Sequence, residues 1–319
     1  MKQIPILSDP LQATPVYELN HAYTKNRMYI KRDDFVPFSF GGNKARKARF
    51  FYRDIMEKQP DILVTYGSGS SNHGRIIANM AAAMGIECHI ISPEEHYKET
   101  TNSRLVTSFG ATIETCAVDR VSEKIDQRLE DLRQKGKHPY FIMGGGHGNF
   151  GIASYVEAYG EILQYEKETG IHFDYVFHAS GTGTTQAGLV CGQMLSNVVN
   201  QRIVGISIAR RAEHGRQVIE DCIRQYLKEC EEIERPDISD YLIFEDAYRK
   251  GGYGEYDQEV LNTIDTVMKY EGIPMDTTYV GKAFCGMNAY LTERNMTDKN
   301  VLFIHTGGTP LFFEDQKRK

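Results

Sequence analysis

The sequence predicts an α/β protein built on mainly parallel β-sheets flanked by helices. Short apolar runs rich in β-branched residues alternate with amphipathic runs along the chain, which is typical of repeated strand–helix units. Several apolar runs end in glycine-rich loops, and in open α/β sheets ligands bind at that edge. The length of 319 residues allows one large or two medium domains, with a sizeable buried core.

The predicted elements follow one another as strand–helix units. Residues 61–66 predict a buried strand that ends in a Gly/Ser loop, and the pattern after the loop predicts a helix over 73–84. A charged amphipathic pattern predicts a helix over 119–134, and the glycines of 144–151 mark the best internal boundary. Residues 246–257, with Gly, Lys/Arg and three tyrosines, predict a mobile loop that could act as a lid. The other predicted strands are 88–91, 111–114, 140–142, 174–179, 203–208 and 300–305, and the other predicted helices are 99–109 and 152–169.

Composition excludes several classes of function. The net charge of −6 and the pI near 6.0 leave no basic footprint for nucleic acid or an anionic membrane. We expect no membrane span and no secretory signal, because apolar runs are short and the first residues lack an apolar signal core. The six cysteines form no Cys-x-x-Cys pair, which argues against a zinc site and a disulfide framework and favours a reducing cytosol.

Lys44 is the residue best suited to covalent chemistry. Gly41 and Gly42 precede it, a helical run begins at it, and Lys47 follows about one turn later. A lysine that acts as an amine must be held still and partly desolvated, so that its pKa falls. Glycines allow a ligand close to the backbone, and a helix start favours an anion. A ligand with an aldehyde and a phosphate would need such an amine and such an anion site. The motif also fits an ordinary turn before a basic helix.

Two further loops offer polar groups at the ends of strands. The loop 67–73 (Gly-Ser-Gly-Ser-Ser-Asn-His) caps a helix and has more hydroxyl and amide groups than capping requires. The loop 180–185 (Ser-Gly-Thr-Gly-Thr-Thr) suits a phosphate, because its backbone N–H groups can converge at a helix start. It lacks the lysine of a P-loop and the spacing of a dinucleotide site, so a smaller phosphate ligand is expected. Among nineteen tyrosines, Tyr253 and Tyr279 read from the residues alone as packing positions.

Together these motifs resemble the fold-type II pyridoxal-phosphate enzymes of the tryptophan synthase β-like superfamily. Within them the chain is similar to the branch of D-cysteine desulfhydrases and 1-aminocyclopropane-1-carboxylate deaminases, nearly from end to end. Thr14-Pro15 resembles the opening motif of that branch, and 29–34 followed by 41–47 resembles its lysine block. Residues 279–283 (Tyr-Val-Gly-Lys-Ala) resemble its Tyr-x-Gly-Lys segment, and 304–308 (Ile-His-Thr-Gly-Gly) its closing strand and loop.

The resemblance implies roles for individual residues. It implies pyridoxal 5'-phosphate as the cofactor, joined to Lys44 as a Schiff base, with Asn72 on the phenolic oxygen and Thr306 at the pyridine nitrogen. The phosphate would be held by Gly181, Thr182, Gly183, Thr184 and Thr185, with Lys47 adding a charge. The substrate carboxylate would meet Ser71, Asn72 and His73, the substrate pocket would include Tyr253 and Tyr279, and the catalytic residues would be Lys44, Ser71, Tyr253 and Tyr279; no metal ligand is implied.

The resemblance also implies an architecture and a reaction. We expect a small domain over 48–155, a large domain made of 1–47 and 156–319, the cofactor between them, and a cytoplasmic homodimer. The reaction expected is β-elimination on a small amino acid, most closely that of a D-cysteine desulfhydrase. Val280 and Thr306 replace the glutamate and leucine of the deaminase pattern, which argues against cyclopropane opening, because a hydroxyl partner leaves the pyridine nitrogen neutral.

Three alternatives stay open at this point. Ser70 replaces the glutamine usual in the desulfhydrase-like loop, and the phosphate loop is closer to that of cysteine synthases, so β-replacement on an amino acid is one alternative. The deaminase reaction is a second alternative. The third is a non-catalytic protein that binds a phosphate ligand, which the presence of Lys44 disfavours.

Overall fold

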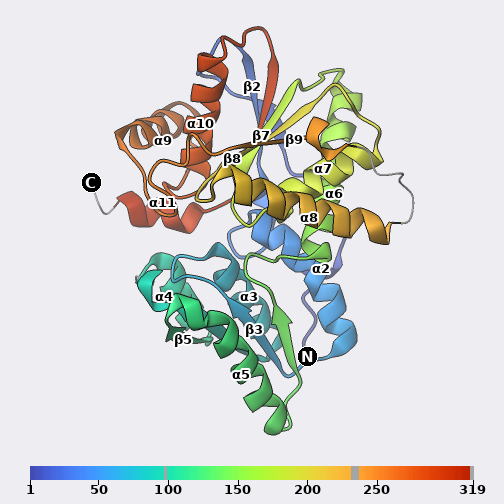
Figure 1. Ribbon diagram of the computed structural model, residues 1–319, viewed down its shortest axis with the longest axis vertical. Helices are drawn as coiled ribbons and strands as arrows, with labels where there is room; N and C mark the ends of the chain where they lie inside the picture. Colours follow the sequence, from blue (N-terminus) through green and yellow to red (C-terminus); the bar gives the residue numbers. More distant parts are fainter. Residues whose placement is uncertain (97–98, 231–236, 317–319) are drawn as a thin grey trace.

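The computed structural model describes residues 1–96, 99–230 and 237–316, and it consists of two α/β lobes, each built around one sheet (Figure 1). The large lobe contains a six-stranded sheet and the small lobe a four-stranded sheet. The predicted fold class, two mainly parallel sheets flanked by helices, is therefore confirmed. None of the helices in the described residues combines the length and apolarity needed to cross a membrane.

The sheet of the large lobe has the strand order β1-β2-β10-β7-β8-β9. β1 pairs antiparallel with β2, and every other neighbouring pair is parallel. β10 lies between β2 and β7, with Leu302 opposite Tyr29 on one side and Val176 on the other. The strands are β1 (Val16–Glu18), β2 (Arg27–Lys31), β7 (Tyr175–Ser180), β8 (Arg202–Ser207), β9 (Leu242–Glu245) and β10 (Asn300–Ile304).

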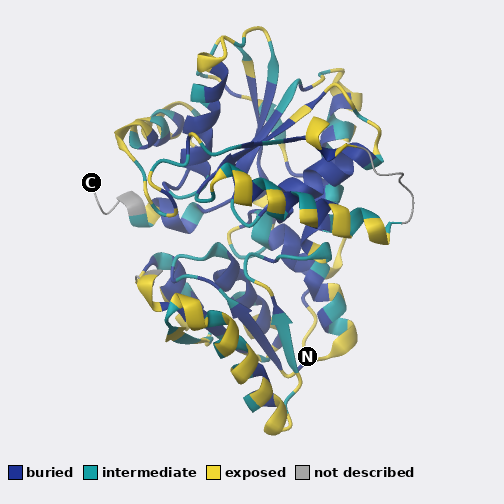
Figure 2. Cartoon of the chain, viewed as in Figure 1, coloured by how far each residue is buried: buried dark blue, intermediate teal, exposed yellow. Residues whose placement is uncertain are grey.

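Helices cover both faces of this sheet, so the central strands β7, β8 and β10 are mostly buried (Figure 2). Alternate strand residues point to opposite faces. Phe177 and Phe303 pack with α9 (Gln258–Glu271) and α10 (Val280–Glu293). Val176 and Leu302 pack in the other core, formed with α6 (Asn149–Thr169), α7 (Thr184–Leu195) and α8 (Ala212–Glu229). Burial on two faces explains why these strands are continuously apolar in sequence.

The small lobe has a parallel sheet in the order β5-β4-β3-β6. Its strands are β3 (Ile62–Tyr66), β4 (Glu87–Pro93), β5 (Thr112–Cys116) and β6 (Pro139–Ile142). One face packs on α1 (Pro5–Ser8), α2 (Asn43–Lys58), α3 (Asn72–Met84) and α4 (Thr101–Ser108), and the other on α5 (Val121–Gln134). Short 3-10 helices span Asp33–Phe35, Glu94–His96, Val118–Arg120 and Ile238–Asp240, and α11 (Thr309–Gln316) ends the described chain.

Residues near the N-terminus contribute to both lobes. The predicted domain boundaries therefore stay a prediction. Ile4 and Leu7 pack in the core of the small lobe, although the prediction assigned 1–47 to the large domain. α2 begins beside the closing strand of the large lobe and ends in the core of the small lobe. This helix therefore connects the two lobes physically.

A buried ionic network holds α2 to the large lobe. The Arg46 guanidinium, which is fully buried, donates to both carboxylate oxygens of Asp33 and to Glu161 on α6. Lys31 also pairs with Glu161, and the Tyr155 hydroxyl donates to Asp33 at 2.7 Å. Burial acts to raise the pKa of Asp33, but the charges of Arg46 and Lys31 hold it at about 2. Each charge in the network thus has an opposite partner, as burial requires.

We expect Arg46→Met to lower the free energy of unfolding by about 3–5 kcal/mol, because it leaves the buried Asp33 carboxylate and the partly buried Glu161 carboxylate short of positive charge. Urea denaturation measures the change. The control is Arg27→Met, which breaks the exposed pair between Arg27 and Glu18 and should have a much smaller effect, because solvent screens exposed pairs. Equal costs for the two variants would contradict the importance of the network.

Candidate active site

A cavity of about 320 Å3 lies between the lobes, at the carboxyl ends of the strands in both sheets. Parallel strands bring their following loops to one edge, so residues far apart in sequence meet there. Most of the predicted site residues line this cavity: Lys44, Ser71, Asn72, His73, Gly181, Thr182, Gly183, Thr185, Tyr253, Tyr279 and Thr306. Lys47 and Thr184 are not in the lining; both are buried directly behind it.

Two glycines bring the start of α2 against the loop that follows β10. Gly41 and Gly42 have positive φ angles of 64° and 91°, which glycine adopts without strain. A Cβ atom on Gly42 would lie 2.6 Å from the carbonyl oxygen of Thr306. The N–H of Asn43 donates to that same oxygen at 3.0 Å. The close approach places Lys44, one residue later, at the floor of the cavity.

The Lys44 side chain is half-buried and donates from Nζ to the carbonyl oxygen of Gly145 at 2.9 Å. No carboxylate pairs with it in the part of the chain that the structure describes. Burial lowers the pKa of Lys44 to about 8. A substantial fraction of the amine is therefore neutral at mildly alkaline pH, as covalent or proton-transfer chemistry requires.

Lys47 provides a second buried amine in the same region. It is 1% exposed, and its Nζ donates to the Thr184 hydroxyl at 3.0 Å and to the Gly145 carbonyl at 3.4 Å. Burial, reinforced by the charge of Lys44, lowers the pKa of Lys47 well below its usual range. Both partners are neutral oxygens, and a buried cation with neutral partners is stabilised by an anion nearby.

The loop before α7 forms a cradle for that anion. Gly183, with φ of 96°, precedes the first residue of the helix, whose first N–H groups have no intrahelical partner. A Cβ atom on Gly183 would lie 3.0 Å from Ile219, so a larger residue would be both strained and crowded. Asn43 Nδ2 donates to the Thr185 hydroxyl at 3.1 Å, which links the cradle to the start of α2.

The loop 67–73 begins α3 and presents its first turn to the cavity. The Ser71 hydroxyl caps the helix by accepting from the N–H of Gly74 at 3.1 Å. The Asn72 side-chain oxygen accepts from Arg75 at 2.6 Å and from Asn102 at 3.0 Å. The amide nitrogen of Asn72 is therefore the group that this side chain can offer to a ligand, together with backbone N–H groups of the first turn.

The His73 ring is hydrogen-bonded to Thr65 and is not available to bind a ligand. The Thr65 hydroxyl donates to the Ile142 carbonyl at 2.6 Å, so its oxygen accepts from His73 Nε2 at 2.8 Å. Burial and the charges of Lys44 and Lys47 hold the pKa of His73 well below its usual range, which keeps the ring neutral. The contribution of His73 to the cavity is thus its backbone N–H, a distinction that sequence reasoning could not make.

Two tyrosines close the mouth of the cavity across the two lobes. The hydroxyls of Tyr253 and Tyr279 lie 2.7 Å apart, and the rings meet edge to face. The Tyr253 hydroxyl also contacts the hydroxyls of Ser68 at 3.1 Å and Ser70 at 3.3 Å, which belong to the small lobe. Burial and the proximity of Tyr253 raise the pKa of Tyr279 well above its usual range, so its hydroxyl stays protonated.

Sequence reasoning missed two parts of the site. Arg210 lines the cavity beyond β8, with Nη1 3.4 Å from the Thr182 carbonyl, and burial lowers its pKa. Gly145 was interpreted only as part of a boundary, yet its carbonyl accepts from both Lys44 and Lys47. The rule that ligands bind beyond the carboxyl ends of parallel strands could have identified Arg210; nothing in the sequence singles out a backbone carbonyl.

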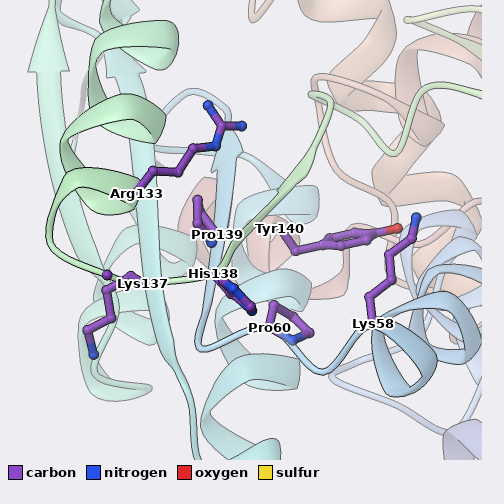
Figure 3. A pocket seen from close by; sticks show the side chains of 8 residues that line it. Lys58, Pro60, Arg133, Lys137, His138, Pro139 and Tyr140 are labelled. Carbon is purple, nitrogen blue, oxygen red and sulfur yellow. The ribbon is translucent and has the colours of Figure 1, made fainter.

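A second hollow lies on the small lobe, beside the start of β6 (Figure 3). Its basic side chains have acidic partners: Lys58 pairs with Asp54 at 2.8 Å and Lys137 with Glu87 at 3.0 Å. It lies at the amino ends of the strands, whereas the cavity between the lobes lies at their carboxyl ends. Because its lysines are already paired and it is open to solvent, this hollow is a weaker candidate for a functional site than the cavity between the lobes. Within the described residues, no group of three or more His, Cys, Asp or Glu side chains is placed to hold a metal ion.

Comparison with known proteins agrees with this geometry. Residues 7–307 match the family described as pyridoxal-phosphate dependent enzyme. The chain is 32% identical to a D-cysteine desulfhydrase of Serratia proteamaculans (strain 568), over 98% of this chain and 96% of that protein. It is also 32% identical to a D-cysteine desulfhydrase of Klebsiella pneumoniae (strain 342), over 90% of this chain and 88% of that protein.

A solved structure described as an ACC deaminase homologue has the same fold. It superimposes with a TM-score of 0.84 and 29% sequence identity, over 96% of this chain and 93% of the other. Agreement over 96% of this chain means that the fold is shared across both lobes. The resemblance inferred from the motifs is thereby confirmed at the level of the family.

In the cofactor-free protein, we expect Lys44 to react with an amine-selective acylating reagent with a pH midpoint near 8, because burial lowers its pKa to about 8. Mass spectrometry of the modified peptides measures the rate at each pH, and pyridoxal phosphate should protect Lys44. Lys137 is the control, since its ion pair with Glu87 raises its pKa. A midpoint for Lys44 near the ordinary lysine value of about 10.4 would contradict the assignment.

We expect Gly183→Ala to weaken the binding of pyridoxal phosphate roughly tenfold or more, because a strained backbone conformation costs about 1–3 kcal/mol. Titration of the visible absorbance measures the dissociation constant. Gly181→Ala is the matched control in the same loop, since a Cβ atom there would meet Ile208 at an ordinary 3.6 Å. Equal affinity of the two variants would show that the cradle does not depend on Gly183.

Proposed function

The chain belongs to the pyridoxal-phosphate dependent enzymes, and from this premise we propose that it is a lyase that converts D-cysteine to pyruvate, sulfide and ammonia. The observation that carries the proposal is the pairing, in one cavity, of a partly desolvated Lys44 with a cationic cradle at Lys47 and Gly183. Near-full-length relatives that are D-cysteine desulfhydrases support the choice of substrate.

The residues present fit the cofactor. Lys47 is a buried amine with neutral oxygen partners beside the start of α7, where a phosphate would stabilise its charged form. Lys44 shares the Gly145 carbonyl with Lys47, so the amine and the cradle lie next to each other. In this proposal Lys47, Thr184, Thr185 and the backbone of 181–183 hold the phosphate, Asn72 donates to the phenolic oxygen, and the Thr306 hydroxyl faces the ring nitrogen.

When bound, pyridoxal phosphate supplies an aldehyde for the substrate amine and a conjugated ring that takes up the electron pair left at Cα. The protein supplies the proton transfers and the orientation. In this proposal Lys44 Nζ removes the Cα proton of the substrate, a task for which a base with a pKa of about 8 is suited. The first-turn N–H groups of α3, with the Asn72 amide, bind the substrate carboxylate and fix the Cα–H bond toward Lys44.

The two tyrosines lie where the Cβ substituent of the substrate would leave. The Tyr279 hydroxyl, whose pKa is held high by burial and by Tyr253, can donate a hydrogen bond or a proton to the departing thiolate. In this proposal the contacts from Tyr253 to Ser68 and Ser70 shield the substrate from water while the bond breaks. Loss of the Cα proton and the Cβ thiolate leaves an unsaturated amino acid, which takes up water to give pyruvate and ammonia.

A specific observation keeps the deaminase reaction as a second candidate, because the solved structure with a TM-score of 0.84 is described as an ACC deaminase homologue. The chain's own residues argue against it. A carboxylate would keep the ring nitrogen protonated, whereas Thr306 lines the cavity with a hydroxyl and Val280 is an aliphatic residue buried in the large-lobe core. A neutral ring is sufficient to expel a thiolate and is a poorer electron sink for opening a cyclopropane.

The proposal extends to assembly and location. We propose a homodimer in the cytoplasm, supported by the family resemblance and by six cysteines that all carry free thiols. Light scattering coupled to gel filtration measures the mass against the 36.3 kDa of one chain. A monomer at micromolar concentration would contradict the dimer.

The purified enzyme should be coloured and should release pyruvate and sulfide from D-cysteine faster than from L-cysteine. The panel also includes D-serine, β-chloroalanine and 1-aminocyclopropane-1-carboxylate, each with and without added thiols or amines. Pyruvate that falls when a thiol is added, with a new amino acid appearing, would favour β-replacement. Ring opening without sulfide release would favour the deaminase, and a colourless inactive protein would favour a non-catalytic role.

We expect Lys44→Ala to lower kcat for D-cysteine at least roughly 100-fold, because it removes both the amine that holds the cofactor and the general base. Pyruvate release and the visible spectrum are the two measurements. The control is Lys58→Ala, which removes an exposed lysine from the last turn of the same helix and should leave both readouts unchanged. A Lys44→Ala protein that kept its activity would end the assignment.

A further inference from the structure

Lys282 is a fully buried lysine that the chemistry proposed above does not use. It lies in the first turn of α10, and its Nζ donates to the carbonyl oxygens of Gly252 at 2.6 Å and Ile208 at 3.2 Å. It forms no ion pair with any residue in 1–96, 99–230 or 237–316. Its ammonium group therefore joins two stretches of backbone to the helix that carries it.

The three segments that meet at Lys282 are those that form the large-lobe side of the cavity mouth. Gly252 directly precedes Tyr253, and Ile208 is followed by Ala209 and Arg210, which line the cavity. Tyr279 is the N-cap residue directly before α10. One side chain thus connects the Tyr253 segment, the Arg210 loop and the Tyr279 helix.

Besides Lys282, the Tyr253 segment is held by ion pairs of Lys250 with Asp257 at 2.8 Å and with Glu259 at 2.9 Å. Turn hydrogen bonds run within it, from Gly252 N–H to Arg249 and from Glu255 N–H to Gly252, both at 3.2 Å. Gly252 is buried, whereas Gly251 and Tyr253 on either side of it are exposed. The bond from Lys282 to Gly252 is buried, whereas the bond from Lys250 to Glu259 is exposed. Segments with few buried contacts open readily, so the Lys282 bond is a main constraint on where Tyr253 lies.

The choice of a lysine here is costly for stability. Burial lowers the pKa of Lys282 to about 8, although the charges of Asp276 and Glu255 act to raise it. A methionine of similar length would fill the same space without desolvating an amine. Methionine cannot donate hydrogen bonds to the two carbonyl oxygens, whereas lysine can. This hydrogen bonding is what the lysine provides here.

We infer that Lys282 is a positioning residue, which holds Gly252 so that the Tyr253 hydroxyl meets Tyr279 and the two serines of the small lobe and closes the cavity over the substrate. The inference rests on the proposed function for its substrate. The structural part of the inference, that the buried amine of Lys282 anchors the Tyr253 segment, does not depend on the reaction.

The test compares Lys282→Met with Gln193→Met. Gln193 is also fully buried and also donates to a backbone carbonyl, that of Gln201 at 2.7 Å, at the far end of α7 from the cavity. Lys282→Met removes two donated hydrogen bonds and Gln193→Met removes one, so the control reports the general effect of losing a buried polar side chain. Trypsin cleavage after Arg249 and Lys250 in the cofactor-loaded protein should be roughly tenfold faster in Lys282→Met than in the control.

Kinetics provide the second readout through a double-mutant cycle. With D-cysteine, Tyr253→Phe should lower kcat/KM roughly tenfold in the wild-type background and less than about threefold in the Lys282→Met background, because the two changes act on one contact. The affinity for pyridoxal phosphate should stay within about twofold, since the cradle is formed by other residues. If Lys282→Met does not fold, Lys282→Gln replaces it, because it keeps a donor that is too short to reach both carbonyls.

The outcomes separate the inference from the proposed function. Equal trypsin cleavage in Lys282→Met and Gln193→Met, or additive losses with Tyr253→Phe, would overturn the positioning role. If the wild-type enzyme releases no pyruvate from D-cysteine, the proposed function fails, while the trypsin comparison still decides the role of Lys282.

Discussion

The buried pairing of Arg46 with Asp33 and Glu161 is the interaction on which the rest of the site depends. It fixes the first turns of α2 against the large lobe, while the end of the same helix packs in the core of the small lobe. Lys44 and Lys47 lie on either side of Arg46 in sequence, so the network determines where both amines lie. A buried network of this kind tolerates little displacement, because every charge in it needs its partner.

A second constraint is electrostatic. Arg46 is neutralised, whereas Lys44 and Lys47 share one backbone carbonyl, and Arg210 contacts the carbonyl of Thr182. Burial of this much positive charge is costly unless an anion joins it. Desolvation lowers the pKa of Lys44, which the chemistry uses, and also makes the cradle selective for an anion. Burial of the lysines is thus the common cause of the low pKa of Lys44 and of the preference of the cradle for an anion.

The interactions that close the mouth of the cavity are weaker than those that form its floor. The floor is made of glycine-mediated close approaches and ion pairs, whereas the mouth is held by hydroxyl contacts between Tyr253 and two serines. A substrate must enter and a product must leave, so contacts of modest strength suit the mouth. The buried amine of Lys282 keeps those contacts in register without adding a charge to the cavity itself.

The sequence alone determined the fold class, most of the strand–helix units and the loops that carry chemistry, because periodicity and glycine placement are local properties. Lys44 and the loop 180–185 were identifiable for the same reason. Three features depended on tertiary structure: the insertion of β10 between β2 and β7, the sharing of the Gly145 carbonyl by two lysines, and the inward turn of the His73 ring toward Thr65. Each arises from contacts between segments distant in sequence, and no local pattern encodes which backbone carbonyl or buried hydroxyl a side chain will meet.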